Sequence, residues 1–266
     1  MSLAISYLPT TLLTLLRTHD FTTLLSWPLF QAFWFGRFWS RVGPEVRTNS
    51  EKNVVPLLQG RVRHGHILPE STPLTEKNPA VSGTVLEIGP GSGMWTSIFT
   101  PRYLPSLTKI YGVEPNPSQH RALARQVSAA GLDDGTYEIL PLGIEDLASS
   151  GRVPKESVDC IVTVMCLCSI PEPRFNIKEL YGYLKPGGRW YVYEHVKCYR
   201  SQGWGMGLYQ AILDYIWPHF VGGCEMSRDT EKWVKEAGPW SEIDLCPLAG
   251  EPWYFTMPHT IGVLTK

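Results

Sequence analysis

The chain has 266 residues and a formal net charge of −1, with 24 Lys and Arg against 25 Asp and Glu. This balance argues against nucleic acid as a partner, because that affinity comes largely from neutralised phosphates. The length predicts one α/β domain with an appended segment rather than two equal domains. The 6 Cys residues show no repeated spacing, so no disulfide framework is expected and a reducing, cytoplasmic compartment is indicated.

The first region, residues 1–42, is hydrophobic and rich in aromatic residues. Its two apolar runs, 3–16 and 21–36, are both shorter than the roughly 20 residues that a membrane-spanning helix needs. No basic stretch precedes the first run, so a secretory signal is not expected. Aromatic residues followed by Arg37 and Arg41 are typical of a membrane–water boundary. The segment is therefore expected to associate peripherally with a membrane or to cap the core or the substrate pocket.

Residues 43–82 are polar, interrupted by prolines and without periodicity. They are expected to form a connector with one short helix near residues 53–59. The connector contains two histidines that flank a glycine, His64 and His66. A metal site is not expected there, because no third ligand lies nearby in the sequence.

From residue 83 to the C-terminus, short apolar runs alternate with longer amphipathic stretches. Asn116 as N-cap and Pro117 at the first helical position mark the start of one helix. Strands that alternate with helices predict a parallel sheet with helices on both faces, whose ligand lies at the carboxyl ends of the strands. Residues 83–266 are thus expected to form the main domain. The expected strands are 84–89, 109–114, 137–142, 159–164 and 189–195, and the expected helices are 117–131 and 176–184.

A glycine-rich turn, EIGPGSG at 87–93, follows the first of these strands. Gly89, Gly91 and Gly93 would let the backbone approach a nucleotide-like ligand closely. Their spacing differs from the dinucleotide fingerprint, because a methionine stands where its third glycine would be. The carboxylate of Glu87 would repel a pyrophosphate but can help to hold a cationic α-amino group. The turn therefore indicates a ligand with an amino acid end.

The second strand ends at Glu114, which is followed by Pro115 and Asn116. An acid at this position can accept hydrogen bonds from both hydroxyls of a ribose. A ligand with an amino acid end and a ribose is S-adenosylmethionine (SAM). Glu114, Pro115 and Asn116 are therefore candidate SAM-binding residues, together with Glu87 and the three glycines.

Residues 84–195 resemble a class I SAM-dependent methyltransferase, whose successive motifs match VLEIGPGSG, YGVEPNP, LGIEDL, SVDCIVTVMCLCSI and LKPGGRWYVYEHV in order. The C-terminal part, including residues 216–238 and the closing PHTIGVLTK, resembles the membrane-associated thiol methyltransferases of the methyltransferase-like seven group. Similar layouts occur in methyltransferases that modify natural products, so the acceptor atom stays open.

The resemblance implies a Rossmann-like α/β sheet, parallel except for an antiparallel last strand, flanked by helices and preceded by a hydrophobic helical segment. The hydrophobic N-terminal anchor of the thiol methyltransferases fits residues 3–39. It implies peripheral association with the cytosolic face of the endoplasmic reticulum or with lipid droplets.

One position departs from the family pattern. Many relatives carry an acid that binds the adenine amino group just after the third strand, where this chain has Gly143. Adenine recognition is therefore expected to rest on Ile144 and Glu145, although an acid there can also stabilise a helix N-terminus. Val164 and Met165, at the end of the fourth strand, are expected to approach the cofactor.

Methyl transfer from a sulfonium requires mainly that the acceptor is held near the methyl group and shielded from water. A thiol acceptor is partly ionised near neutrality, whereas a hydroxyl or ammonium acceptor needs a base more. His195, directly after the fifth strand, is the first candidate base, with Glu194 as its orienting partner or as a structural acid. A histidine there can equally bond a backbone carbonyl.

The run MCLCS at 165–169 is expected to line the rim of the cofactor and acceptor sites. If the strand stays extended, Cys166 and Cys168 point to one side and Met165 and Leu167 to the other. A metal is not expected, because the sequence places no further ligands there, and Cys224 is expected to be a packed residue. Cys168 is the residue to mutate first.

Residues 204–220 are apolar nearly all round and are predicted to form a helix that covers a hydrophobic acceptor. The sequence as a whole predicts a methyltransferase that acts on a heteroatom, with thiol sulfur favoured and N or O open, of a small hydrophobic or amphipathic molecule, as in secondary metabolism. The alternative is a SAM-binding relative that catalyses a non-methylating reaction such as cyclisation. The sequence indicates no oligomeric state.

Overall fold

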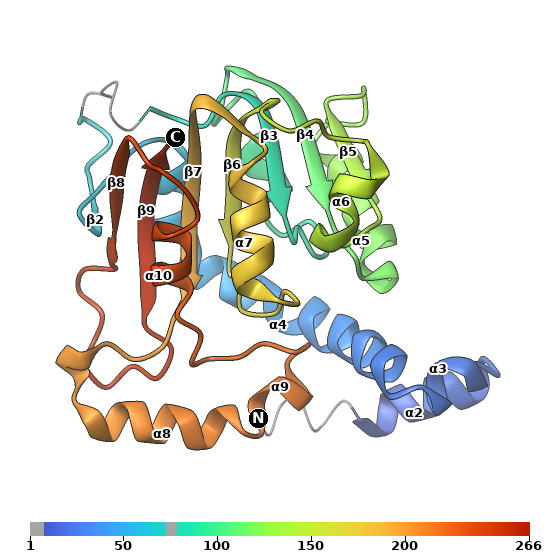
Figure 1. The fold of residues 1–266 in the computed structure, drawn as a ribbon. Coiled ribbons are helices and arrows are strands. Elements are labelled where there is room, and N and C mark those ends of the chain that lie inside the picture. The colour runs from blue at the N-terminus through green and yellow to red at the C-terminus, as the bar shows by residue number, and fades with distance from the viewer. Residues whose placement is uncertain (1–7, 73–78) are drawn as a thin grey trace.

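The computed structural model describes residues 8–72 and 79–266 (Figure 1). Its main feature is a sheet with the strand order β5-β4-β3-β6-β7-β9-β8. The strands from β5 to β7 pair in parallel, and β9 runs antiparallel to both β7 and β8. The predicted parallel sheet with an antiparallel last strand is therefore confirmed. The strands are β3 (Gly83–Ile88), β4 (Leu107–Val113), β5 (Tyr137–Leu140), β6 (Val158–Val164), β7 (Leu184–His195), β8 (Glu242–Pro247) and β9 (His259–Thr265).

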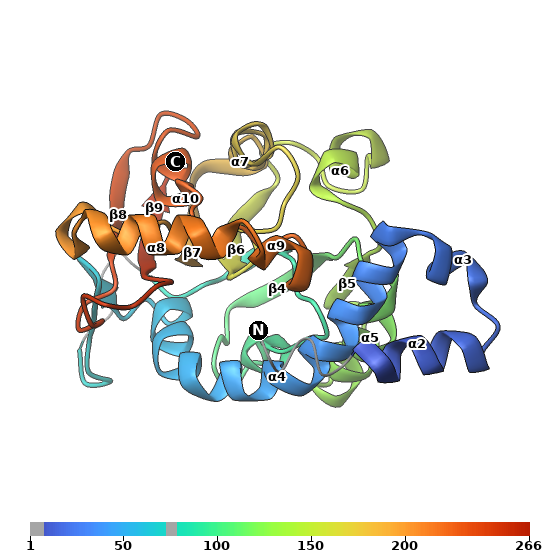
Figure 2. The ribbon, with the colours of Figure 1, turned by 90° about the horizontal axis from the view of Figure 1, so that it is seen from below.

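Alternating residues of the strands enter two hydrophobic cores, one on each face of the sheet. Val85 and Tyr191 face the core formed with α5 and the end of α4, whereas Leu86 and Trp190 face the core formed with α6, α7 and α10. The view from below shows these helices on opposite faces (Figure 2). The helices are α4 (Trp27–Leu58), α5 (Pro117–Ala129), α6 (Ile144–Ser150), α7 (Pro173–Tyr181) and α10 (Thr230–Lys235), and a 3₁₀ turn, η1 (Thr96–Phe99), lies beside α5.

The N-terminal region forms α2 (Leu8–Arg17), α3 (Phe21–Leu25) and the 32-residue helix α4. Helix α4 crosses the expected boundary between residues 42 and 43 and continues to Leu58 with Pro44 and Pro56 inside it, so the short helix expected near residues 53–59 is the end of a longer one. A proline inside a helix costs about 3 kcal/mol. Leu57 and Leu58 are fully buried in the main core, and such burial stabilises by about 1.5–3 kcal/mol per side chain. Val54 of α4 is fully buried in the same core, and the burial of these three side chains offsets the cost of Pro44 and Pro56.

A small hairpin follows α4 and is formed by β1 (Val62–Arg63) and β2 (His66–Ile67). Further along the chain, a 3₁₀ turn, η2 (Arg200–Gln202), precedes α8 (Trp204–Asp214) and α9 (Trp217–Phe220). The predicted single helix over 204–220 is thus two helices. The break precedes Pro218, which has no N–H to donate to the carbonyl of Asp214 four residues earlier and therefore lies in the first turn of the second helix.

Helices α4, α8 and α9 lie below the carboxyl ends of the parallel strands (Figure 1, Figure 2). Gln31 of α4 donates a 2.8 Å hydrogen bond to the carbonyl of Pro218 in α9, which joins the two layers. In the part of the chain that the structure describes, no helix has the length and apolar character that crossing a bilayer requires.

Candidate functional site

The glycine turn after β3 leaves open space at its centre. Gly89, Gly91 and Gly93 all have positive φ angles, at 64°, 58° and 83°. A Cβ at Gly89 would lie 2.7 Å from Cys166, and one at Gly93 would lie 2.7 Å from Gln126, so both glycines are required by packing as well. At Gly91 no described atom lies within 4 Å of such a Cβ. The turn therefore offers backbone next to a space in which a ligand fits.

The carboxylate of Glu114 ties the end of β4 to this turn. One oxygen accepts the backbone N–H of Gly91 at 2.8 Å, and the other accepts that of Asn116 at 2.8 Å. The structure thus brings together Glu114, Gly91 and Asn116, as the sequence predicted. Burial raises the pKa of Glu114, although the two backbone N–H groups and the charge of His120 oppose the shift. Each oxygen keeps a lone pair that can accept a ribose hydroxyl.

Glu87 has a partner that sequence reasoning missed. Its Oε2 accepts a 2.6 Å hydrogen bond from the hydroxyl of Tyr137 in β5. The ring of Tyr137 crosses β4 at Gly112, where a Cβ would collide with it. Burial raises the pKa of Glu87 to about 7, the Tyr137 hydroxyl lowers it, and the nearby Glu114 raises it. A glycine in the strand between Glu87 and Tyr137 is the signal that points to this contact.

Helix α4 covers the turn and the start of α5. Arg47 donates to the carbonyl of Met94 at 2.6 Å and to Oγ of Ser97 at 2.7 Å. Asn116 caps α5 through the backbone N–H of Ser118, as predicted, and its Nδ2 also donates to the carbonyl of Ala32 in α4 at 3.3 Å. Helix α4 therefore contacts both sides of the predicted cofactor site.

The predicted adenine contacts, Ile144 and Glu145, begin α6 at the carboxyl side of β5. Gly143 is the N-cap residue of this helix, and the Glu145 side chain folds back against it, so a larger residue at 143 would collide with the Glu145 carboxylate. Ile144 is buried in the hydrophobic core that α6, α7 and α10 form with the sheet. Both residues thus lie at the edge of the sheet where the ligand is expected, on the far side of β4 from the glycine turn.

The chain turns directly after β6, which corrects the expectation for the MCLCS run. Val164 is the last strand residue, and Met165 has a φ of 52°, so the strand does not stay extended to Cys168. The backbone N–H of Met165 donates to the carbonyl of Tyr193 at 2.8 Å. Leu167 is consequently buried in the core, and Cys166 lies beneath Gly89.

Glu194 is the structural acid that holds this turn, which is one of its two predicted roles. Its hydrogen bonds go to the turn, so they do not support the other predicted role, which is to orient His195. Its carboxylate accepts the backbone N–H groups of Cys166 at 3.1 Å and Leu167 at 3.2 Å. Adjacent residues of a strand point to opposite faces, so Glu194 and His195 of β7 diverge. Burial raises the pKa of Glu194 to about 8.

His195 meets two cysteines that the sequence does not place near it. Its Nε2 lies 3.2 Å from Sγ of Cys224, and Cys168 lies within 4.8 Å of both atoms. All three side chains are buried, and Nδ1 of His195 has no hydrogen-bond partner in the described chain. Cys224, which was expected only to be packed, therefore belongs to the site together with Cys168.

The pKa values of these three side chains depend on one another. Hydrogen bonding from Cys224 and the proximity of His195 hold the pKa of Cys168 well below the ordinary thiol value, against the effect of burial. Burial on its own lowers the pKa of His195, but the negative charge on Cys168 raises it to above its usual value. The pKa of Cys224 is raised.

Apolar side chains from three elements surround the cysteines. Cys168, Val221 and Cys224 form one buried cluster, against which Phe35 of α4 and Phe220 of α9 pack. This packing shields the two cysteines from water.

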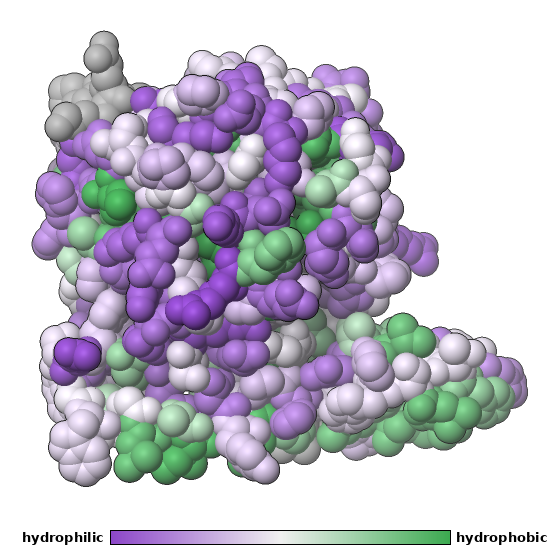
Figure 3. Space-filling model, in the orientation of Figure 1, coloured by the Kyte–Doolittle hydropathy of each residue, from purple (hydrophilic) through white to green (hydrophobic). Residues whose placement is uncertain are grey.

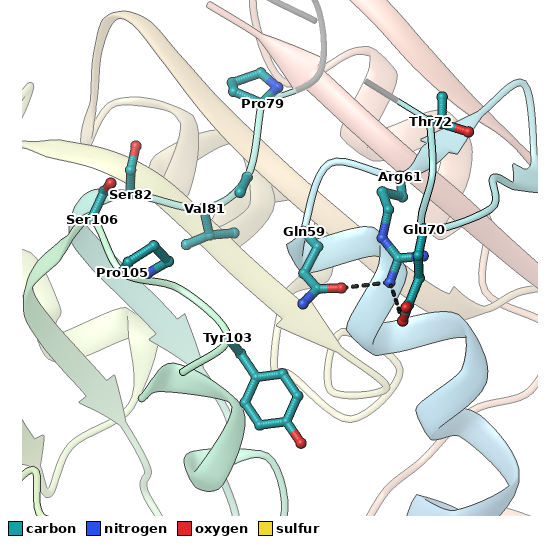
Figure 4. A pocket seen from close by; sticks show the side chains of 11 residues that line it. Gln59, Arg61, Glu70, Thr72, Pro79, Val81, Ser82, Tyr103, Pro105 and Ser106 are labelled. Atoms are coloured by element: carbon teal, nitrogen blue, oxygen red, sulfur yellow. Dashed lines mark hydrogen bonds and ion pairs between the residues drawn. The ribbon is translucent and has the colours of Figure 1, made fainter. Parts of the chain in front are cut away.

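The cavity in Figure 4 lies at the opposite edge of the sheet. Ser82 and Ser106, which line it, precede β3 and β4, so the cavity is at the amino ends of the strands. Arg61 lies there between Gln59 and Glu70, and contacts both (Figure 4). This cavity is therefore separate from the site at the carboxyl ends.

Comparisons with known proteins agree with the geometry. The sequence model of the methyltransferase domain family matches residues 63–238. The chain is 30% identical over 189 residues to thiol S-methyltransferase TMT1B of Rattus norvegicus, which covers 69% of this chain and 70% of the relative. It is 26% identical over 192 residues to thiol S-methyltransferase TMT1A of Homo sapiens, with 71% and 72% covered.

Two solved structures show the same fold at low sequence identity. An O-methyltransferase family protein from Burkholderia thailandensis matches with a TM-score of 0.51 and 17% identity, over 88% of this chain and 58% of that one. The [4+2]-cyclase SpnF matches with a TM-score of 0.54 and 16% identity, over 88% and 96%. The chain therefore belongs to the methyltransferase family, and it is a class I enzyme that depends on SAM.

Proposed function

We propose that this methyltransferase methylates the sulfur atom of a small hydrophobic thiol. The observation that carries the proposal is the similarity, over about two thirds of the chain, to relatives named thiol S-methyltransferases. The apolar side chains of Val221 and Phe220, which pack around Cys168 and Cys224 next to His195, favour a hydrophobic acceptor.

SAM fits the residues at the carboxyl ends of β3 and β4. The open space at Gly91 admits the ligand, Glu114 would accept the ribose hydroxyls, and Glu87 lies beneath the turn for the amino acid end. Ile144 and Glu145 would flank the adenine. Bound SAM supplies a methyl group that its positive sulfur already activates. His195 would then take up the thiol proton, since it is the basic side chain at the end of β7.

A set of acceptors with one carbon skeleton tests the proposal. The enzyme would be incubated with SAM and benzyl mercaptan, benzyl alcohol or benzylamine, and methylated product and S-adenosylhomocysteine would be measured. We expect the thiol to react at least about tenfold faster than the others, because it is the acceptor that ionises near neutrality. Glu114→Ala is the control that should abolish every reaction. Preferential methylation of the alcohol or the amine would refute the thiol proposal, and SAM binding without methylation of any acceptor would favour a non-methylating reaction such as cyclisation.

We also propose that the enzyme docks on a lipid bilayer, for which helix α8 provides the argument. Gln210 is the residue of α8 that is buried, and it bonds the carbonyls of Val196 and Met226. The large apolar residues point outward, and Trp204 is 86% exposed. A helix that buries a polar residue and exposes large apolar side chains differs from an ordinary surface helix and is typical of an interfacial one.

Exposed apolar residues of α2 and α3 extend this surface. Leu12, Leu13 and Leu16 of α2 are exposed, and so is Leu25 of α3. Apolar patches on α8 and on α2–α3 lie along the same lower edge of the molecule (Figure 1, Figure 3). A single planar surface can therefore contact both, which favours a bilayer over a small partner.

Flotation with phosphatidylcholine vesicles tests the docking. Replacing Leu12, Leu13 and Leu16 together by serine should lower the vesicle-bound fraction at least about tenfold, because binding scales with buried apolar area. Phe175→Ser is the matched control, since this exposed residue lies on α7, away from the edge. Unchanged flotation of the triple variant, or a dimer that buries the same leucines, would overturn the docking.

A further inference from the structure

We propose that Cys168, His195 and Cys224 form a binding site for a zinc ion. One ligand atom of each residue, the two Sγ atoms and a ring nitrogen, lies within 4.8 Å of the others, and all three residues are buried. They come from the loop after β6, the end of β7 and the loop after α9. The site adjoins, but does not include, the residues that would hold SAM.

The spacing of the ligand atoms suits tetrahedral zinc. Zinc bonds of about 2.3 Å to sulfur and about 2.1 Å to nitrogen place these two atoms about 3.6 Å apart in a tetrahedral site. Nε2 of His195 and Sγ of Cys224 are 3.2 Å apart. The pair therefore needs to open by only a few tenths of an ångström to accept the ion.

The donor set and its charge favour zinc over hard cations. Thiolate and imidazole ligands select zinc, whereas magnesium and calcium prefer oxygen ligands. Two thiolates, a neutral imidazole and a divalent ion sum to zero charge, which a buried apolar compartment tolerates. Trp217 donates its indole N–H toward Sγ of Cys224 at 3.4 Å. Such a donor is the kind of surrounding hydrogen bond that a metal-bound thiolate accepts.

Arg228 holds the two cysteine loops together. Its guanidinium donates to the carbonyls of Leu167 and Ile170 at 2.9 and 2.7 Å, and it pairs with Glu225 at 3.0 Å. The backbone N–H of Glu225 in turn donates to the carbonyl of Cys168 at 3.0 Å. The ligands are thus positioned by contacts outside the cluster, as a preformed metal site requires.

A second group, His64, Asp244 and Cys246, also has its ligand atoms within 4.8 Å of one another, but its residues are not all buried. The His64 side chain is 85% exposed. Asp244 already accepts the backbone N–H of His64 at 2.8 Å, and this bond explains the position of Asp244 next to the turn between β1 and β2. This group therefore serves as the internal control for the buried one.

Three protein ligands leave a fourth tetrahedral position, which is the pattern of catalytic zinc sites. Resting on the proposed function, we assign this position to the acceptor sulfur. A His195 that binds zinc cannot also act as the base of the proposed function, so in the zinc form the acceptor thiol loses its proton to solvent as its sulfur binds. The sulfur lone pair then forms the new bond to the methyl carbon, while the electron pair of the broken carbon–sulfur bond stays on the former sulfonium. The product thioether is neutral and a weaker ligand, which favours its release.

Metal content of the full-length protein tests the site without any acceptor. After dialysis against zinc sulfate and then metal-free buffer with a non-chelating reductant, the wild type should retain about one zinc per chain. Cys168→Ser and Cys224→Ser should retain less than about one tenth of that, whereas the matched Cys246→Ser should retain all of it. A wild type that holds no zinc, or zinc lost from Cys246→Ser and kept by Cys224→Ser, would overturn the proposal.

Cobalt substitution gives a readout that does not depend on the folding of any variant. The cobalt form of the wild type should show the intense visible bands of a tetrahedral site and a sulfur-to-metal charge-transfer band. Benzyl mercaptan, added without SAM, should strengthen the charge-transfer band, and benzyl alcohol should not. An unchanged spectrum would overturn the assignment of the acceptor sulfur. Zinc binding together with methylation of the amine alone would refute the proposed thiol function but not the metal site.

Discussion

Replacing Tyr137 by phenylalanine would remove the hydroxyl that donates to the buried carboxyl of Glu87 at 2.6 Å. Burial raises the pKa of Glu87 from 4.5 to about 7, and the Tyr137 hydroxyl restrains this rise. A carboxyl with a raised pKa stabilises the fold most below its unfolded pKa, and this stability is lost as the pH rises through the folded pKa. For Glu87 the loss falls between about pH 4.5 and pH 7 and amounts to about 3 kcal/mol.

The substitution should therefore cost more at high pH than at low pH. At pH 5 the folded-state carboxyl is protonated, and the lost hydrogen bond is a neutral one worth about 1 kcal/mol. At pH 8.5 the lost bond goes to a charged acceptor and is worth about 2 kcal/mol or more. The pKa of Glu87 should also rise further in the variant, which extends the pH range over which stability falls.

Urea denaturation at pH 5 and pH 8.5, followed by circular dichroism, measures both free energies of unfolding. Tyr191→Phe is the matched control, because Tyr191 is also a buried residue but its hydroxyl donates to a neutral acceptor, the carbonyl of Pro79, at 2.7 Å. It should cost about 1 kcal/mol at both pH values. An equal cost of Tyr137→Phe at the two pH values would refute the reasoning that Glu87 ionises in the folded protein near neutrality.

Three further substitutions test the cofactor site and its cover. Gly91→Ala should destabilise the fold by only about 1–2 kcal/mol. It should nevertheless lower SAM affinity at least about tenfold in calorimetry, because the added Cβ would fill the space at the turn. Unchanged affinity would contradict this. Glu114→Gln should weaken SAM binding about tenfold, since one backbone N–H and the ribose lose a charged acceptor; binding equal to wild type would remove Glu114 from the site. Arg47→Met should destabilise by about 1–3 kcal/mol in urea through loss of its bonds to Met94 and Ser97, and an unchanged midpoint would show that α4 docks without them.

Much of the fold and part of the site are local properties that the sequence could predict. The start of α5 at Asn116 and Pro117 depends on contacts within a few residues. The link between Glu114 and Gly91 follows from parallel strands that begin and end at the same edges of the sheet. The length of α4 could not be predicted in this way, because Pro44 ends a helix by local rules and burial of Leu57 and Leu58 keeps it.

The sulfur-rich stretch at 165–169 shows the same division. The sequence determined by itself that residues 159–164 form a strand near the glycine turn, because a short apolar run rich in β-branched residues is typical of a buried strand. Where the side chains of 165–169 point depended on the positive φ of Met165, which the Glu194 carboxylate supports from the next strand. The meeting of Cys168, His195 and Cys224 was decided by tertiary structure alone, since His195 and Cys224 are 29 positions apart and no periodicity connects their loops. Local patterns thus determined the elements and the cofactor turn, whereas packing over long sequence separations decided which groups share one buried compartment.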